Sequence, residues 1–262
     1  MNRLVDKMTN LKKQKRKAFI GYIMAGEPGW DATADIILEM EGVGVTAVEL
    51  GVPFSDPIAD GPVIQAAANR ALANGVNLSS IFKQVKRIRE KTEIPILLMG
   101  YWNVFLQYGR ARLLENAKLS AIDGFIIADL PLEAEPKFFA NAKENGLCTV
   151  LLASELTPDN RLEKIVKTST GFVYYIPQLG ITGLDLQITD AVKARIKRIR
   201  SMTDEPVCIG IGVKTREHVK ILNKVADGVI VGTHLVEFIQ AHRNKKDIGA
   251  LVGGLINTLL ER

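Results

Sequence analysis

The chain has 262 residues, a formal net charge of +5, 47% hydrophobic residues and 24% charged residues. One α/β barrel of about 250 residues would use this whole length, so we expect a single domain over residues 1–262. No charged leader followed by an apolar run opens the sequence, and no apolar stretch approaches the roughly 20 residues that span a bilayer. We therefore expect a cytoplasmic protein with no membrane partner.

Two basic clusters and two cysteines are the other features of the composition. The clusters lie at residues 12–17 and 193–200. Basic patches can bind nucleic acid or acidic ligands, but aromatic stacking partners are scarce, so we interpret both clusters as solvated faces and expect no nucleic acid. Cys148 and Cys208 lie inside apolar runs, which indicates small core residues and argues against a disulfide or a cysteine metal site.

Short runs rich in β-branched residues alternate with longer amphipathic segments, which is typical of successive βα units. The predicted strands are Phe19–Met24, Ala47–Val52, Ile96–Tyr101, Gly124–Asp129, Thr149–Ser154, Phe172–Ile176, Val207–Gly212 and Gly228–Gly232. The predicted helices are Ala32–Glu41, Ile64–Ala73, Leu78–Lys91, Arg110–Leu119, Glu133–Asn145, Asn160–Lys167, Leu186–Arg200, Arg216–Lys224 and Ile248–Leu260.

Residues 1–14 are predicted to form an extra amphipathic helix that plugs the barrel floor. Eight parallel strands with right-handed crossovers close into a barrel, whereas five or six more often form an open sheet. The predicted fold is therefore α/β, a single (β/α)₈ TIM barrel with an extra N-terminal helix. In this fold the active site lies at the C-terminal ends of the strands and in the loops that follow them.

The second predicted strand places a carboxylate inside the barrel. Strand alternation directs Val48, Leu50 and Val52 toward the helices and Glu49 toward the barrel axis. A carboxyl group buried there loses hydration, which raises its pKa toward the range useful for proton transfer. Glu49 is the leading candidate for a general acid and base. The alternative is a structural ion pair, although no predicted strand supplies an obvious lysine or arginine partner.

A second carboxylate, Asp60, follows a loop stiffened by Pro53 and Pro57 and precedes a predicted helix start at Gly61. Aspartate is a preferred N-cap residue, so capping is as good an interpretation of this residue type and position as catalysis. Two carboxylates in different settings can divide the work, one exchanging protons while the other stays anionic and stabilises positive charge. That arrangement suits Glu49 and Asp60.

Glycine-rich stretches at 180–183, 210–212 and 232–233 follow three consecutive predicted strands. Glycines let an anion approach backbone N–H groups at a helix N-terminus, and barrel enzymes often bind phosphate after strands seven and eight. Tight turns are the alternative explanation for each glycine. The three histidines are not spaced as metal ligands, so no metal is expected. No lysine lies within a predicted strand, so a Schiff-base mechanism is not expected either.

The run from Glu49 to Pro57, continued by residues 59–62 and Ile64-Gln65, resembles the signature of the tryptophan synthase alpha subunit. Supporting matches occur in family order at Ala25-Gly26-Glu27-Pro28, Tyr101 with Asn103, Asp129-Leu130-Pro131, Gly180-Ile181-Thr182-Gly183 and Gly210-Ile211-Gly212. The resemblance implies cleavage of indole-3-glycerol phosphate to indole and glyceraldehyde 3-phosphate. It also implies an alpha2-beta2 heterotetramer in which a beta subunit holds pyridoxal phosphate, while the alpha chain itself uses no cofactor.

The resemblance also implies roles for individual positions. Glu49 protonates indole C3 and helps deprotonate the glycerol hydroxyl, Asp60 accepts a hydrogen bond from the indole N–H, and Tyr174 lies beside the substrate. The remaining implied residues are phosphate-binding Gly183, Gly212, Gly232 and Thr233, substrate or loop residues Tyr22, Tyr101, Asp129 and Thr182, and partner contacts Pro53, Phe54, Asp56 and Pro57.

The sequence departs from the family pattern at Pro177-Gln178-Leu179, Met24, Tyr22 and Thr233-His234. Two other functions remain open. One is another phosphate-binding barrel enzyme, such as an isomerase or cyclase. The other is a catalytically weak subunit that acts mainly as an allosteric activator of the beta subunit.

Overall fold

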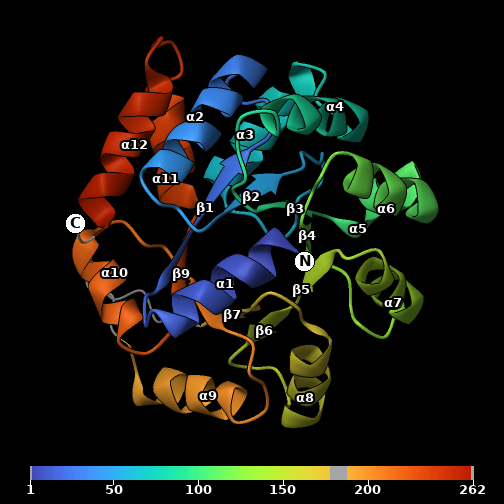
Figure 1. The fold of residues 1–262 in the computed structure, drawn as a ribbon, viewed down its shortest axis with the longest axis vertical. Coiled ribbons are helices and arrows are strands. Elements are labelled where there is room, and N and C mark those ends of the chain that lie inside the picture. The colour runs from blue at the N-terminus through green and yellow to red at the C-terminus, as the bar shows by residue number, and fades with distance from the viewer. Residues whose placement is uncertain (1, 178–187, 261–262) are drawn as a thin grey trace.

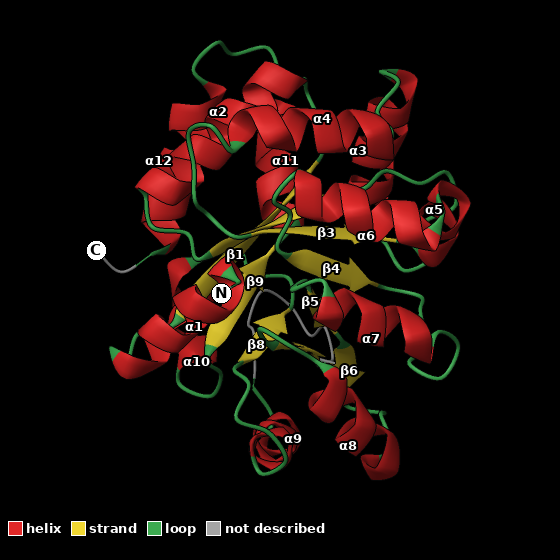
Figure 2. Cartoon of the chain, turned by 45° about the vertical axis from the view of Figure 1, so that its right-hand side comes forward, coloured by secondary structure: helices red, strands yellow, loops and turns green. Residues whose placement is uncertain are grey.

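The structure, a computed structural model, describes residues 2–177 and 188–260. Its parallel strands form a ring enclosed by helices (Figures 1 and 2). The strands are β1 (Ala18–Met24), β2 (Ala47–Gly51), β3 (Ile96–Gly100), β4 (Gly124–Ile127), β5 (Cys148–Val150), β6 (Leu152–Ser154), β7 (Val173–Ile176), β8 (Val207–Gly210) and β9 (Gly228–Val231). Their order is β5-β4-β3-β2-β1-β9-β8-β7-β6. Because β5 and β6 are consecutive parts of one segment, the ring closes through Leu151, and the predicted TIM barrel is confirmed.

The helices that surround and close the ring are α1 (Arg3–Lys13), α2 (Trp30–Gly42), α3 (Pro62–Ala73), α4 (Leu78–Ile88), α5 (Trp102–Tyr108), α6 (Arg110–Leu119), α7 (Pro136–Glu144), α8 (Asp159–Thr168), α9 (Asp190–Arg200), α10 (Arg216–Asn223), α11 (Thr233–Ala241) and α12 (Ile248–Leu259). The start predicted for α9 lies outside the described residues. None of the helices in residues 2–177 and 188–260 is both long and apolar enough to cross a membrane.

The structure differs from the predicted elements in three places. The strand predicted over Thr149–Ser154 is divided, because β5 pairs with β4 while β6 pairs with β7. Between them, the Leu151 N–H donates to the Ser169 hydroxyl at 3.1 Å instead of to a strand. The prediction also missed α5 and α11. Helix α11 begins two residues after β9, and the Trp102 N–H at the start of α5 donates to the Asp129 carboxylate at 2.6 Å.

Buried apolar side chains form two layers, as strand alternation predicts. Val48, Leu50 and Val52 belong to the layer between barrel and helices, whereas Ala47 belongs to the layer inside the barrel. The inner layer is closed at the bottom by Leu4, Met8 and Leu11 of α1, and Figure 1 shows α1 lying across the ring of strands. The predicted floor helix is therefore confirmed. Cys148 and Cys208 are buried inner-layer residues with free thiols.

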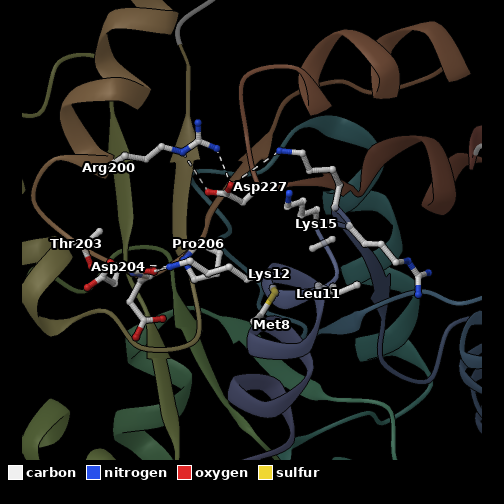
Figure 3. A pocket seen from close by; sticks show the side chains of 13 residues that line it. Met8, Leu11, Lys12, Lys15, Arg200, Thr203, Asp204, Pro206 and Asp227 are labelled. Carbon is white, nitrogen blue, oxygen red and sulfur yellow. Dashed lines mark hydrogen bonds and ion pairs between the residues drawn. The ribbon is translucent and has the colours of Figure 1, made fainter.

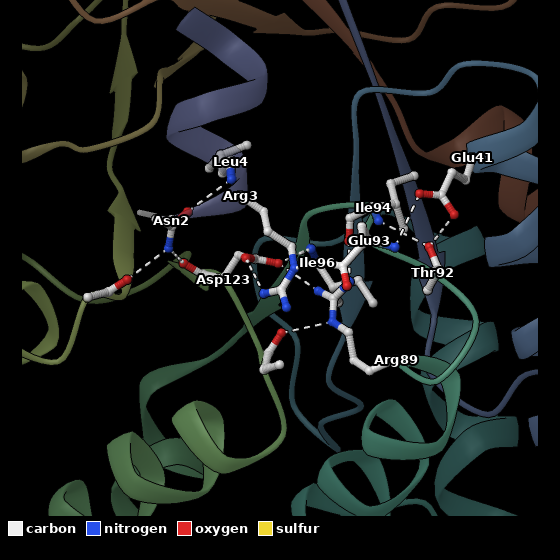
Figure 4. Close-up of polar contacts among 12 residues, drawn as sticks. Asn2, Arg3, Leu4, Glu41, Arg89, Thr92, Glu93, Ile94, Ile96 and Asp123 are labelled. Atoms are coloured by element: carbon white, nitrogen blue, oxygen red, sulfur yellow. Dashed lines mark hydrogen bonds and ion pairs between the residues drawn. The ribbon is translucent and has the colours of Figure 1, made fainter. Parts of the chain in front are cut away.

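A buried charge cluster ties α1 to the bottom of the barrel (Figure 4). The Asp123 carboxylate accepts hydrogen bonds from the Ile96 N–H at 2.8 Å and from Arg89 Nη2 at 2.6 Å, and Arg3 Nη1 lies at 3.2 Å. The Asn2 amide donates to the Asp123 carbonyl at 2.7 Å. The Arg89 side chain is only 7% exposed. Two cations and a strand amide therefore compensate one buried carboxylate.

Replacing Asp123 should destabilise the barrel strongly. Asp123→Ala leaves the Arg89 guanidinium buried without its carboxylate, which should lower the free energy of unfolding by about 3–5 kcal/mol in urea denaturation. Glu93→Ala is the matched control, because Glu93 pairs with Arg3 at the same cluster but is 78% exposed. It should lower the free energy of unfolding by less than about 1 kcal/mol. Equal losses in the two variants would contradict this account of the cluster.

Candidate active site

A cavity of about 240 Å³ opens at the C-terminal ends of the strands. Seven residues expected at the site line it together: Tyr22, Glu49, Asp60, Tyr174, Gly212, Gly232 and Thr233. They come from β1, β2, β7 and the loops or helix starts that follow β2, β8 and β9. The expected Thr182 and Gly183 lie outside the described residues.

Glu49 lies at the base of this cavity with an unusual environment. Its side chain is fully buried, and neither carboxylate oxygen has a hydrogen-bond partner among the described residues. Burial raises the pKa of Glu49 to about 8. No salt bridge to Glu49 occurs in the described part of the chain, so the structural ion pair is contradicted there. The carboxyl group is therefore protonated at neutral pH and can give up its proton when a base or substrate approaches.

Two tyrosine side chains occupy the same level of the barrel as Glu49. Tyr22 is the register partner of Glu49 on the neighbouring strand. A Cβ atom on Gly51 would lie 2.2 Å from the Tyr22 hydroxyl, and one on Gly210 would lie 2.3 Å from the Tyr174 hydroxyl. Only glycine leaves room for the two hydroxyl groups at these positions. Burial, reinforced by the nearby carboxylates, raises the pKa of both phenols, so both remain neutral donors.

The Asp60 carboxylate is positioned by Tyr101 and does not cap a helix. The Tyr101 hydroxyl accepts a hydrogen bond from the Ala59 N–H at 3.0 Å and donates to the Asp60 carboxylate. Burial raises the pKa of Asp60, and the hydrogen bond from Tyr101 opposes that rise. The N-cap of α3 is Gly61, without a side-chain capping bond, so the capping interpretation of Asp60 is wrong.

The far side of the cavity is built from glycines and a helix start. Gly212 has a φ of +28°, and Gly232 is the N-cap of α11, with Thr233 as its first residue. The first N–H groups of a helix have no partner within it and carry partial positive charge. A Cβ atom on Gly232 would meet the Tyr22 side chain at 3.5 Å, so this backbone faces the tyrosine. The arrangement fits an anion held beside Tyr22.

Some expected residues lie away from this cavity. Asp129 lines a separate pocket, and its carboxylate accepts the hydrogen bond from α5. In the loop after β2, Pro53 and Pro57 are buried, while Asp56 is exposed. The Phe54 ring packs 5.5 Å from the Tyr101 ring, centroid to centroid. The two prolines and Phe54 therefore support the loop that carries Asp60, and Asp56 faces outward.

Sequence reasoning missed several residues of the site. Lys214 and His234 line the cavity, and Ile58 projects from the loop after β2 with 86% of its surface exposed. Lys214 follows the glycine stretch 210–212 by two residues, which was the available signal. Nothing in the local pattern distinguishes Ile58 from a buried loop residue.

A second cavity, of about 340 Å³, lies at the opposite end of the barrel beside α1 (Figure 3). Lys12, Lys17 and Arg200 from the two basic clusters meet around it. Arg200 pairs with Asp227 at 2.6 Å, and Lys12 donates to the Asp204 carbonyl at 3.0 Å. None of the expected site residues lines this cavity, so the candidate active site is the one at the C-terminal mouth.

A closed parallel barrel with titratable side chains gathered at its C-terminal mouth defines a TIM-barrel enzyme. The sequence model of the family described as tryptophan synthase alpha chain matches residues 8–252. The alpha chain of Alkalilimnicola ehrlichii is 42% identical over 240 residues, covering 91% of this chain and 88% of that one. That of Citrifermentans bemidjiense is 35% identical, with coverages of 99% and 97%. The chain belongs to the tryptophan synthase alpha chain family.

Solved structures agree with this assignment. The tryptophan synthase subunit alpha of Legionella pneumophila superposes with a TM-score of 0.90 at 33% identity, covering 99% of this chain and 97% of that one. A Pyrococcus furiosus structure superposes with a TM-score of 0.85 at 37% identity, covering 92% and 97%.

Glu49 should make the stability of the fold depend on pH. Because its pKa is about 8 in the folded protein and near 4.5 when unfolded, its contribution is present in full below pH 4.5. That contribution is lost as the pH rises through 8. Above pH 8 the buried carboxylate is ionised, which destabilises the fold. Glu49→Gln removes this charge and should raise the free energy of unfolding on the order of 3–5 kcal/mol at pH 9, relative to wild type, with little gain at pH 4. Urea denaturation at both pH values measures it.

The exposed Glu115→Gln change provides the control for that measurement, because it removes the same charge from a solvated helix surface. Its effect on unfolding should be small and similar at pH 4 and pH 9. If Glu49→Gln were no more stable than wild type at pH 9, another group would have to stabilise the ionised Glu49 carboxylate in the folded protein.

Proposed function

We propose that this chain is a carbon–carbon lyase that cleaves indole-3-glycerol phosphate into indole and glyceraldehyde 3-phosphate. One observation carries the proposal: a buried, unpartnered Glu49 shares a cavity with Asp60, which Tyr101 holds in place. The family to which the chain belongs supports the same reaction. Another phosphate-binding barrel enzyme has no evident need for both carboxylates.

Glu49 supplies the proton in this reaction. Burial keeps its carboxyl group protonated at neutral pH, so it can donate a proton to C3 of the indole ring. Protonation converts the ring to an indolenine whose C=N⁺ bond withdraws electrons from the adjacent carbon–carbon bond. The resulting Glu49 carboxylate then accepts the proton of the glycerol hydroxyl. The bond breaks, indole regains its aromatic ring, and the glycerol fragment leaves as an aldehyde.

Asp60 and the glycine-lined side of the cavity orient the substrate. The Asp60 carboxylate accepts a hydrogen bond from the indole N–H and stabilises the positive charge that develops on that nitrogen. The backbone at Gly212, Gly232 and Thr233 receives the phosphate at the start of α11. Because the protonated substrate withdraws the electrons itself, the chain needs no cofactor of its own for this step.

Indole release should collapse when either carboxylate is neutralised. Glu49→Gln keeps the shape of the side chain but removes proton transfer, so turnover should fall by at least 10²–10⁴-fold. The amide in Asp60→Asn cannot supply negative charge to the indolenine, so turnover of this variant should fall by about 10²-fold or more. Both are assayed by mixing purified protein with indole-3-glycerol phosphate, with circular dichroism confirming the fold. Turnover within a few-fold of wild type in either variant would remove that residue from its role.

We also propose that the chain assembles with a tryptophan synthase beta subunit, which would hold pyridoxal phosphate, in an alpha2-beta2 heterotetramer. The Pyrococcus furiosus relative is described as part of an a2b2 complex with mutual activation. In this chain, Asp56 and Ile58 are exposed on the loop that carries Asp60. A partner that covers this loop would bury an apolar side chain and hold Asp60 in place.

Ile58→Ser should weaken that assembly. Loss of one buried apolar side chain from an interface should raise the dissociation constant about tenfold, without lowering the stability of the free chain. Leu119→Ser is the matched control, since Leu119 is also exposed, at 65%, but ends α6. Titration with the beta subunit, following binding and indole release together, tests the proposal. A rate that stays constant despite complex formation would contradict activation through this loop.

A further inference from the structure

The acidic and basic side chains around the active-site cavity come from different strands and the segments that follow them. The carboxylates Glu49 and Asp60 come from β2 and the loop after it, whereas Lys214 follows β8 and His234 follows β9. In the ring, β1 lies between β2 and β9. The cavity therefore has an acidic side, where the carboxylates lie, and a basic side, where the backbone of Gly212 and Gly232 also lies.

The backbone at Lys214 is held on both sides. Val213, the residue before it, is buried. Thr215, the residue after it, is the N-cap of α10, and the Thr215 hydroxyl accepts a hydrogen bond from the His218 N–H at 3.2 Å. The Lys214 N–H itself donates to His218 Nδ1 at 3.3 Å. These contacts fix where the side chain leaves the backbone, and Lys214 is one of the residues that line the cavity.

Lys214 supplies the ammonium side chain of the basic side. It is the one lysine or arginine among the described residues that line the cavity, and within residues 2–177 and 188–260 no carboxylate lies within salt-bridge distance of it. Burial lowers the pKa of His234, the nearby Glu237 opposes that shift and Lys214 adds to it. His234 is therefore mostly neutral at neutral pH.

A phosphate monoester needs more positive charge than the backbone offers. It carries about −1.5 to −2 charges at neutral pH, whereas a helix N-terminus supplies the equivalent of roughly +0.5. A lysine ammonium beside the helix start closes most of that difference and donates hydrogen bonds to the phosphate oxygens. The exposure of Lys214 also keeps it from the desolvated state that a Schiff-base lysine requires.

We propose that the Lys214 ammonium is the side-chain counterion of the substrate phosphate and sets the preference of this site for phosphorylated over uncharged ligands. The inference rests on the proposed function for the identity of the substrate, but the anion contact is measurable without turnover. Glycerol 3-phosphate reports the phosphate contact alone, and indole reports the rest of the cavity.

The test compares Lys214→Met, Lys214→Arg and wild type. Lys214→Met should raise the dissociation constant of glycerol 3-phosphate about fivefold to tenfold at low salt, the effect of one partly screened charge contact, and leave that of indole unchanged. The difference from wild type should shrink at high salt. Lys214→Arg should restore most of the affinity. With indole-3-glycerol phosphate, the loss should appear in KM more than in kcat.

Lys224→Met is the matched control, since it removes the same charge from an exposed residue at the opposite end of α10. It should bind glycerol 3-phosphate as wild type does. If Lys224→Met and Lys214→Met weakened glycerol 3-phosphate binding equally, the inference of a local contact between Lys214 and the phosphate would be overturned. Unchanged binding in Lys214→Met, with normal indole release by wild type, would overturn the inference and leave the proposed function standing. Lys214-dependent binding without indole release by wild type would support the contact and refute the proposed reaction.

Discussion

The burial of Glu49 without a counterion is the constraint on which the rest of the site depends. A carboxyl group at the barrel axis keeps a raised pKa only if neither a cation nor bulk water reaches it. The surrounding side chains meet this condition, because Tyr22 and Tyr174 are neutral, buried and aimed into the same space. Their hydroxyls fit only because Gly51 and Gly210 have no side chains. A carboxyl group that stays protonated at neutral pH thus follows from packing rather than from a charged neighbour.

Such a site destabilises the end of the barrel that contains it, and the opposite end is built differently. There, Leu4 and Met8 of α1 fill the inner layer, and the Asp123 carboxylate meets Arg89, Arg3 and a strand amide. Every charged group of that cluster has a partner of opposite sign, in contrast to Glu49. In a TIM barrel, the C-terminal face carries chemistry and the N-terminal face carries stability, and this chain shows the physical basis of that division.

The eight strand-like runs that alternate with helical segments were enough to predict the barrel. Side-chain alternation within a strand predicted the inward direction of Glu49 and the outer layer of Val48 and Leu50, because side-chain direction in a strand follows from a period of two. The break at Leu151 was not predictable, since it depends on a hydrogen bond from the Leu151 N–H to the hydroxyl of Ser169, which lies in a later segment of the chain. Asp60 was ambiguous for a similar reason: the hydroxyl that positions it belongs to Tyr101, which is remote in sequence. Local patterns report backbone direction well and long-range hydrogen bonds poorly.

The two carboxylates of the site therefore differ in how firmly they are held. Glu49 is fixed by strand pairing on both sides, with Tyr22 and Leu97 as its register partners. Asp60 lies on a loop whose position depends on hydrogen bonds to Tyr101 and on the packing of Phe54 against the same ring. A protein bound to the exposed face of this loop would change the setting of Asp60 while leaving Glu49 where it is. In the proposed reaction, activation by a partner would then act on the stabilisation of the indolenine cation by Asp60 and not on the acidity of Glu49, because only Asp60 lies on the loop.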